Sequence, residues 1–168
     1  LPRLRDRHPG ILVHLITGSR IADLHRQEAD LSLRMVRPHQ AELVCRRVGA
    51  MPYAVYAHRE GCPARWICLV ESAIGLPEGR WLEEARGAVA PVLRVDRTAA
   101  METAAAAGLG LALLPTPMGD DNPALVRVDP EAAPPLVRDL WLVVHRDLRD
   151  VPRIRAVMDM LAELAGGL

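Results

Sequence analysis

Three arginines that follow apolar segments are the side chains best suited to ligand chemistry. Arg20, Arg34 and Arg97 each come just after a candidate strand, at the start of a candidate helix or loop. Backbone amides at a helix start already favour anions, and a guanidinium can clamp a carboxylate through two hydrogen bonds. Arginine is also the only long cation in this chain, which contains no lysine. The sequence alone therefore leaves two interpretations open, an anion clamp or ordinary surface charge.

The other reactive residue types form no recognisable constellation. Cys62 and Cys68 have no second pair, and His58 is the one imidazole near them, which fits no usual zinc spacing. No serine lies in a GxSxG elbow. Gly108 and Gly110 precede a candidate strand instead of following one, and a dinucleotide fingerprint needs a third glycine. We therefore expect no catalytic residue, no metal ligand and no cofactor, and so no enzyme.

Length and composition narrow the class of protein. The 168 residues, 50% hydrophobic and 25% charged, are typical of a globular protein with one domain or two small lobes. A net charge of +0 argues against a broad cationic face for nucleic acid. Three cysteines, an odd number, favour a reducing, cytoplasmic compartment. No apolar run reaches the roughly 18 residues of a membrane span. A small molecule or a protein is the expected partner.

Hydrophobic patterning predicts alternating strands and helices, which indicates the α/β class. The opening residues are expected to be the end of a helix, and residues 116–123 a surface turn. A strand, helix and strand over residues 11–34 predict a parallel unit whose carboxyl edge would bind ligands. Candidate helices begin at caps Asp96 or Thr98 and Asp150, among others. The candidate helices cover residues 19–28, 80–88, 98–107 and 150–165. The candidate strands cover residues 11–17, 30–34, 42–48, 52–58, 66–70, 92–95, 111–115, 125–128 and 139–145.

Four stretches in order carry a family pattern, namely RDRHPGILVHLITGS, EADLSLRMVRP, DRTAAMETAAAAGLGLALLP and LWLVVHRDLRDVPRIRAVMDMLAEL. Together they resemble the effector-binding domain of LysR-type transcriptional regulators over nearly the whole chain. The most specific parts are AAAAGLGLALLP and the segment from LWLVVH to the last helix. The HPG turn and EADLSLR add support but are less specific.

The resemblance implies an α/β fold of the type 2 periplasmic-binding-protein kind, with two Rossmann-like lobes joined by two crossing strands. Residues 1–50 plus 145–168 would form lobe I and residues 51–144 lobe II. A small effector, a carboxylate or another anion, would bind in the cleft between the lobes. Carried over by position, the ligand-binding residues would be Thr17, Gly18, Ser19, Leu33, Arg34, Met35, Asp96, Arg97 and Thr98.

The family resemblance also sets expectations about partners. It implies self-association as a dimer or tetramer, and DNA binding through an N-terminal winged helix-turn-helix that this chain lacks. From the resemblance we also expect the first strand and most of the first helix of the effector domain to be missing, which would leave an N-terminally truncated fold with an open sheet edge. A solute-binding protein of the same fold remains the alternative, and an enzyme on this scaffold is a third class that no candidate residues support.

Overall fold

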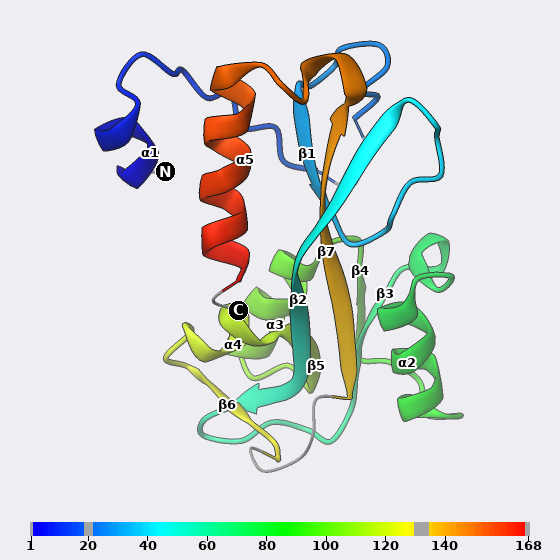
Figure 1. The fold of residues 1–168 in the computed structure, drawn as a ribbon. Coiled ribbons are helices and arrows are strands. Elements are labelled where there is room, and N and C mark those ends of the chain that lie inside the picture. The colour runs from blue at the N-terminus through cyan, green and yellow to red at the C-terminus, as the bar shows by residue number, and fades with distance from the viewer. Residues whose placement is uncertain (1, 19–21, 130–134, 167–168) are drawn as a thin grey trace. The chain divides into compact units, whose positions relative to one another are not determined.

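The computed structural model describes residues 2–18, 22–129 and 135–166 (Figure 1). The chain divides into two compact units, unit 1 with Leu1–Ala50 and Arg138–Leu168, and unit 2 with Met51–Val137. The helices and strands are α1 (Pro2–Arg7), β1 (Leu31–Arg34), β2 (Leu43–His58), β3 (Ile67–Leu69), η1 (Glu71–Ala73), α2 (Pro77–Arg86), β4 (Leu93–Val95), α3 (Thr98–Ala106), β5 (Ala112–Pro115), α4 (Thr116–Asp120), β6 (Leu125–Arg127), β7 (Leu136–His145), η2 (Arg146–Leu148) and α5 (Pro152–Ala165).

Unit 1 is a small sheet with α5 against it. The strand order is β1, β7, β2, and β1 pairs antiparallel with β7 from Leu31 opposite Val144 to Arg34 opposite Trp141. Helix α5 begins at Pro152, whose fixed φ suits the first turn of a helix. Its apolar face buries Ile154, Met160 and Ala165, while Leu142, Val143 and Val144 of β7 are completely or almost completely buried. This packing forms the core of the unit.

One glycine lets α5 approach β2 closely. A Cβ atom at position 49 would overlap the backbone carbonyl oxygen of Ala165, at the end of α5. Gly49 lies in β2, so only a residue without a side chain allows the strand and the helix end to meet there.

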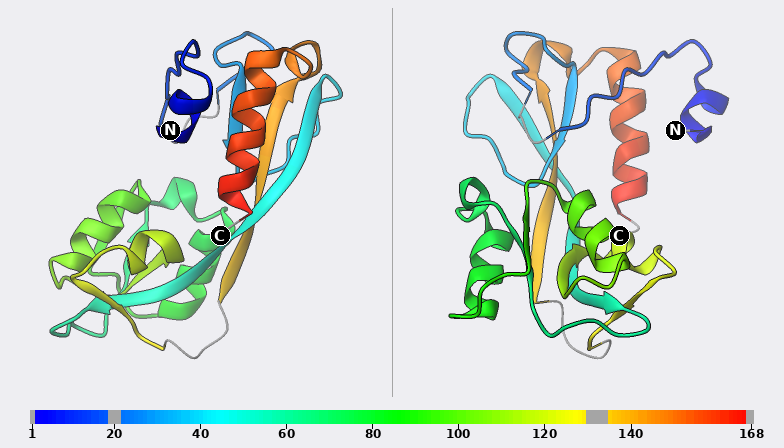
Figure 2. Two further views of the ribbon diagram at one scale, coloured as in Figure 1. Left: turned by 60° about the vertical axis from the view of Figure 1, so that its left-hand side comes forward. Right: turned by 180° about the vertical axis from the view of Figure 1, so that it is seen from behind.

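Unit 2 contains the parallel part of the fold. β3 pairs with β4 in parallel, from Ile67 opposite Leu93 to Leu69 opposite Val95. A parallel bridge between Trp66 and Leu111 places the chain leading into β5 on the other side of β3. From β3 the chain moves to β4 on one side, and from β4 it then returns across β3 to β5 on the other side, so the order is β4, β3, β5. Right-handed crossovers then put α2 and α3 on opposite faces, as Figure 2 shows.

An ion-pair group ties α2 to this sheet. The carboxylate of Glu83 in α2 accepts hydrogen bonds from Arg86 Nε at 2.8 Å and from Arg94 Nη1 of β4 at 2.9 Å. Hydrogen bonds from Arg86 and Arg94 lower the pKa of Glu83 to about 2. The carboxylate therefore stays charged, and α2 is held over the strands, with Leu82 buried below it.

The second half of β2 belongs to unit 2. It pairs antiparallel with β5, from Tyr53 opposite Pro115 to Tyr56 opposite Ala112, and with β6, from Tyr56 opposite Arg127 to His58 opposite Leu125. Because β2 begins in unit 1 and ends in unit 2, a single strand passes through both. The sequence predicted two strands at residues 42–48 and 52–58. This was wrong, since the backbone stays extended through Gly49 and Pro52.

The N-terminal region differs most from the sequence prediction. Residues 11–17 form no strand, and Leu12, Leu15 and Ile16 are 81%, 72% and 69% exposed. Apolar runs predict buried strands only where a neighbouring strand can pair with them. β1 takes β7 as its antiparallel partner instead, so the predicted parallel unit is wrong.

The predicted helix over residues 19–28 is wrong in its described part. Residues 19–21 lie outside the described residues, and residues 24–27 form turns. The Asp23 carboxylate accepts hydrogen bonds from the backbone amides of His25 and Arg26 at 2.9 and 3.2 Å. Gln27 has a φ of 57°, outside the helical region. A short polar side chain that bonds to nearby amides competes with helix formation, which explains the difference.

Later elements agree more closely with the sequence. The helix expected at residues 98–107 is α3, and Gly108 follows it with a φ of 76°, as a C-terminal glycine should. Its N-cap residue is Arg97 and that of α5 is Val151, so the expected side-chain caps by Asp96, Thr98 or Asp150 are wrong. The surface turn expected at residues 116–123 is wrong in its first part, because residues 116–120 form the short helix α4, in which Thr116 and Gly119 are buried.

Candidate functional site

One group of predicted site residues lies at the end of β1 in unit 1. Leu33 is 50% exposed, whereas Arg34 and Met35 are half-buried. The backbone carbonyl of Met35 accepts a hydrogen bond from Arg138 Nη2 at 3.2 Å, which fixes the chain as it leaves the strand. The three residues thus lie on one short stretch of chain, of which only Leu33 is exposed.

Arg34 is already engaged by the protein. Its Nε donates to Ser32 Oγ at 2.8 Å, and its Nη2 donates to the backbone carbonyl of Ala22 at 2.8 Å. Burial lowers the pKa of Arg34, and the charges of Cys45 and Asp23 partly oppose this effect. Two of its donors are used, so the guanidinium holds the turn that begins near Ala22 against β1.

The predicted group of Thr17, Gly18 and Ser19 does not lie at the end of a strand as expected. Thr17 and Gly18 are exposed and lie outside any strand. Ser19 lies outside the described residues. The expectation that these residues follow a strand at a sheet edge is wrong, because residues 11–17 adopt no strand.

The predicted group of Asp96, Arg97 and Thr98 lies at the junction of β4 and α3 in unit 2. Asp96 and Arg97 follow β4, and Thr98 is the first residue of α3. The side chains of Arg97 and Asp96 are 71% and 69% exposed and form an ion pair, with 3.6 Å between Arg97 Nε and Asp96 Oδ2. In the first turn of a helix the backbone amides have no partner within the helix and carry partial positive charge. A cationic side chain and helix amides therefore meet at this junction.

The parallel pairing identifies further residues at the same edge. Because β3 and β4 are parallel, their carboxyl ends lie at one edge, and Val70 donates its amide to the carbonyl of Val95 at 2.9 Å. Glu71 and Ser72, which begin η1 after β3, are exposed there. The sequence analysis did not select them, although the apolar segment just before them was a sufficient signal.

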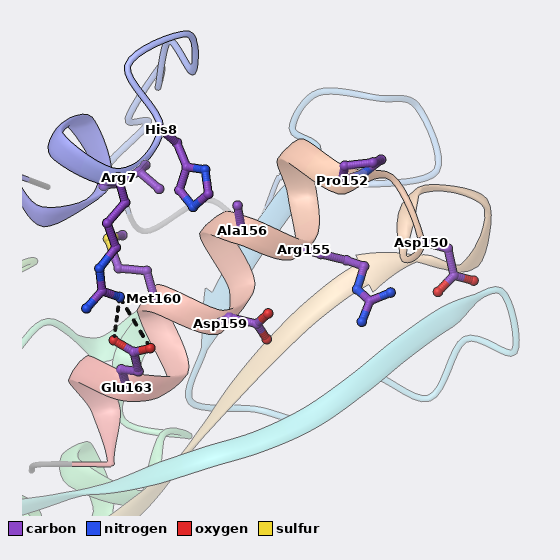
Figure 3. Close-up of a pocket in the computed structure, with 10 residues that line it drawn as sticks. Arg7, His8, Asp150, Pro152, Arg155, Ala156, Asp159, Met160 and Glu163 are labelled. Carbon is purple, nitrogen blue, oxygen red and sulfur yellow. Dashed lines mark hydrogen bonds and ion pairs between the residues drawn. The ribbon is translucent and has the colours of Figure 1, made fainter.

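A hollow in unit 1 contains none of the predicted residues. It lies between α1 and α5 and has a volume of about 380 Å³ (Figure 3). Arg7 and Glu163 face each other there, with Arg7 Nη1 at 3.1 Å from Glu163 Oε2. Asp159 pairs with Arg46 at 3.6 Å. The charges of this exposed hollow thus offset one another, and it offers no concentrated attraction for an anion.

Two kinds of site find no support among the residues that the structure describes. No group of three or more His, Cys, Asp or Glu side chains could hold a metal ion there. No helix in the same ranges is long and apolar enough to cross a membrane.

Cys45, Cys62 and Cys68 are free thiols, and burial raises the pKa of Cys68 above its usual value.

Comparisons with known proteins place this geometry in a family. The model of the LysR substrate binding domain matches residues 1–166. The chain is 25% identical to the Mau operon transcriptional activator of Paracoccus denitrificans over 173 residues, which is 97% of this chain but 59% of that protein. The chain therefore spans less than two thirds of the length of this curated relative.

Solved structures show the same fold. The regulatory domain of CrgA, a LysR-type transcriptional regulator from Neisseria meningitidis, is similar with a TM-score of 0.78 and 17% identity, covering 98% of this chain and 89% of that one. The CcmR regulatory domain of Synechocystis PCC6803 in complex with 2-PG is similar with a TM-score of 0.67 and 16% identity, covering 98% of this chain and 90% of that one. The fold is thus the type 2 periplasmic-binding-protein-like α/β fold of LysR regulatory domains. With the family model covering residues 1–166, this chain belongs to the LysR substrate-binding domain family and is a LysR-type effector-binding domain.

Proposed function

We propose that this domain senses a small anionic molecule, a carboxylate or a related anion, in the cleft between the lobes that the family resemblance implies. Residues 1–50 plus 145–168 would make up lobe I and residues 51–144 lobe II. The observation that carries the proposal is the junction of β4 and α3. There the exposed guanidinium of Arg97 stands beside the first amides of a helix.

The proposal gives the candidate residues different roles. Arg97 would anchor the anion, with the amides and hydroxyl of Thr98 orienting it and Asp96 exchanging its ion pair for the ligand. Arg34 would act as a positioning residue, because its hydrogen bonds hold the turn near Ala22 against β1. Thr17, Gly18, Ser19, Leu33 and Met35 would complete the site from lobe I.

The role in the whole protein follows from the family. We infer that an effector shifts the domain between conformations, and that paired DNA-binding domains elsewhere in a longer chain read this change. The relative that acts on the Mau operon is a transcriptional activator, and CcmR was solved with 2-PG. Self-association as a dimer or tetramer and a cytoplasmic location are part of this proposal. The family match does not favour a solute-binding protein or an enzyme.

The test is a ligand screen followed by arginine substitutions. Thermal shift against a panel of carboxylates, aromatic acids, phosphates, amino acids and sugars would find the class, because a ligand that binds the native state raises Tm. For any anionic hit, calorimetry should show that Arg97→Ala weakens binding by about 1.5 to 3 kcal/mol. Arg80→Ala removes another exposed arginine of unit 2 and should leave the affinity unchanged.

The substitutions also separate the two arginines. Arg34→Ala should lower the Tm of the ligand-free protein, because two hydrogen bonds are lost. If Arg97→Ala and Arg80→Ala bind an anionic hit equally well, Arg97 is not the anchor. If the only hits are neutral or cationic molecules, the anionic effector itself is refuted.

A further inference from the structure

A second hollow lies entirely within unit 2 and contains none of the residues proposed for the effector. It has a volume of about 390 Å³ and lies among β2, the residues before β3 and β5, α2 and the end of β6. Its lining includes Trp66, Trp81, Ala85, Leu111, Val128 and Asp129. A volume of this size suits a small organic molecule, since known ligand pockets are about 300 to 1,000 Å³.

Two tryptophans give this hollow its chemical character. The rings of Trp66 and Trp81 are packed edge to face, with centroids 5.6 Å apart and an angle of 80° between the planes. Both side chains are half-buried, so ring surface stays accessible. The face of an indole ring is electronegative and attracts ammonium groups, which makes such a pair a suitable wall for an apolar cation.

The charge balance of the hollow points the same way. Arg127 lines it, but its guanidinium is paired with Asp120, with Arg127 Nε at 2.9 Å from Asp120 Oδ1. Tyr56 also donates its hydroxyl to Asp120 at 2.7 Å. Asp129, by contrast, is exposed, and the described parts of the chain provide no ion-pair partner for it. One uncompensated carboxylate therefore remains at the hollow.

The strands separate this hollow from the β4–α3 junction. Trp66 precedes β3 and Leu111 precedes β5, whereas Asp96 to Thr98 follow the carboxyl end of β4, which is parallel to β3. From Trp66 to Val70 the extended chain covers four residues, about 13 Å. A ligand in this hollow would thus lie at the opposite end of the strands from the proposed anion anchor.

We propose that unit 2 carries a second ligand site, in which Trp66 and Trp81 pack against the apolar body of a small organic cation and Asp129 binds its ammonium group. The site requires no contribution from unit 1 and is independent of the effector proposal. A cation here and an anion at Arg97 would be two separate inputs to one domain.

Nuclear magnetic resonance of the 168-residue chain can test this site directly. The chain has three tryptophans, so its spectrum holds three indole N–H signals that single Trp→Phe variants assign. Titration with phenethylammonium chloride should shift the signals of Trp66 and Trp81 and leave those of Trp141 and of the Thr98 amide in place. Phenylacetate has a similar ring and the opposite charge, so its affinity at this hollow, read from the Trp66 and Trp81 signals, should be at least about fivefold weaker.

A matched pair of charge-neutralising variants tests the role of the carboxylate. Asp129→Asn should weaken phenethylammonium binding by about fivefold, as expected for a partly exposed charge pair. Asp121→Asn changes the net charge equally, lies outside the hollow and should have no effect. The site is refuted if phenethylammonium leaves Trp66 and Trp81 unshifted, if phenylacetate shifts these two signals with equal affinity, or if the two Asn variants bind phenethylammonium alike.

Discussion

Tyr56 shows how a single buried side chain can carry a measurable pH dependence. Its ring is 1% exposed, and its hydroxyl donates to Asp120 at 2.7 Å. Burial, with the hydrogen bond to Asp120 adding to it, raises the pKa of Tyr56 to about 12. A tyrosine in an unfolded chain titrates near a pKa of about 10. The folded state therefore holds the phenolic proton more tightly than the unfolded state does.

This difference makes stability fall at alkaline pH. Between pH values of about 10 and 12 the unfolded chain loses the Tyr56 proton while the folded chain keeps it, so the free energy of unfolding decreases by about 1 to 2 kcal/mol. Lysine, which titrates in the same interval, is absent from the chain. Urea unfolding at several pH values should show a smaller decrease for Tyr56→Phe. Equal decreases in both proteins would rule out Tyr56 as the source.

At the scale of elements, the approach of α5 to β2 depends on Gly49. Gly49→Ala places a methyl group on the Ala165 carbonyl, so either the strand or the helix end must move. We expect a loss of about 2 kcal/mol in the free energy of unfolding, typical of overpacking. Gly10→Ala is the control, because a Cβ there meets nothing within 4 Å. If the two variants unfold at the same urea concentration, the close approach does not exist in solution.

The elements predicted correctly from the sequence are those in which a nearby glycine or proline marks where the element begins or ends. Gly108 ends α3 and Pro152 starts α5, so their places follow from nearby residues alone. The start of α3 at Thr98 was also predicted, although the side-chain cap expected from Asp96 or Thr98 is not formed. Residues 11–17 carry an equally clear apolar pattern, yet whether they form a strand depends on partners that local sequence does not specify. The hydrogen bonds of Arg34 to Ala22 and Ser32 also could not be inferred from spacing.

For the whole molecule, β2 links the stability of the two units. Residues 43–50 of this strand belong to unit 1 and residues 51–58 to unit 2. Unfolding of either unit removes order from a strand that the other needs, so we expect one cooperative transition. Trp141 reports on unit 1 and Trp66 with Trp81 on unit 2. Within each of the proteins Trp141→Phe and Trp66→Phe/Trp81→Phe, the fluorescence midpoint should coincide with the midpoint from far-ultraviolet circular dichroism. Separate midpoints within one protein would show independent units.

The exposed apolar run at residues 11–16 has a consequence for how the chain meets proteases. A protease binds its substrate as an extended strand, and chain without ladder hydrogen bonds reaches that shape at little cost. Leu12 and Leu15, which are 81% and 72% exposed, offer side chains that chymotrypsin-like enzymes accept. Limited digestion followed by mass spectrometry should find the first cuts there. First cuts within β2 or β7 would contradict the exposure of this segment. The remaining core of residues from about β1 onward would then be the fragment that resists digestion longest.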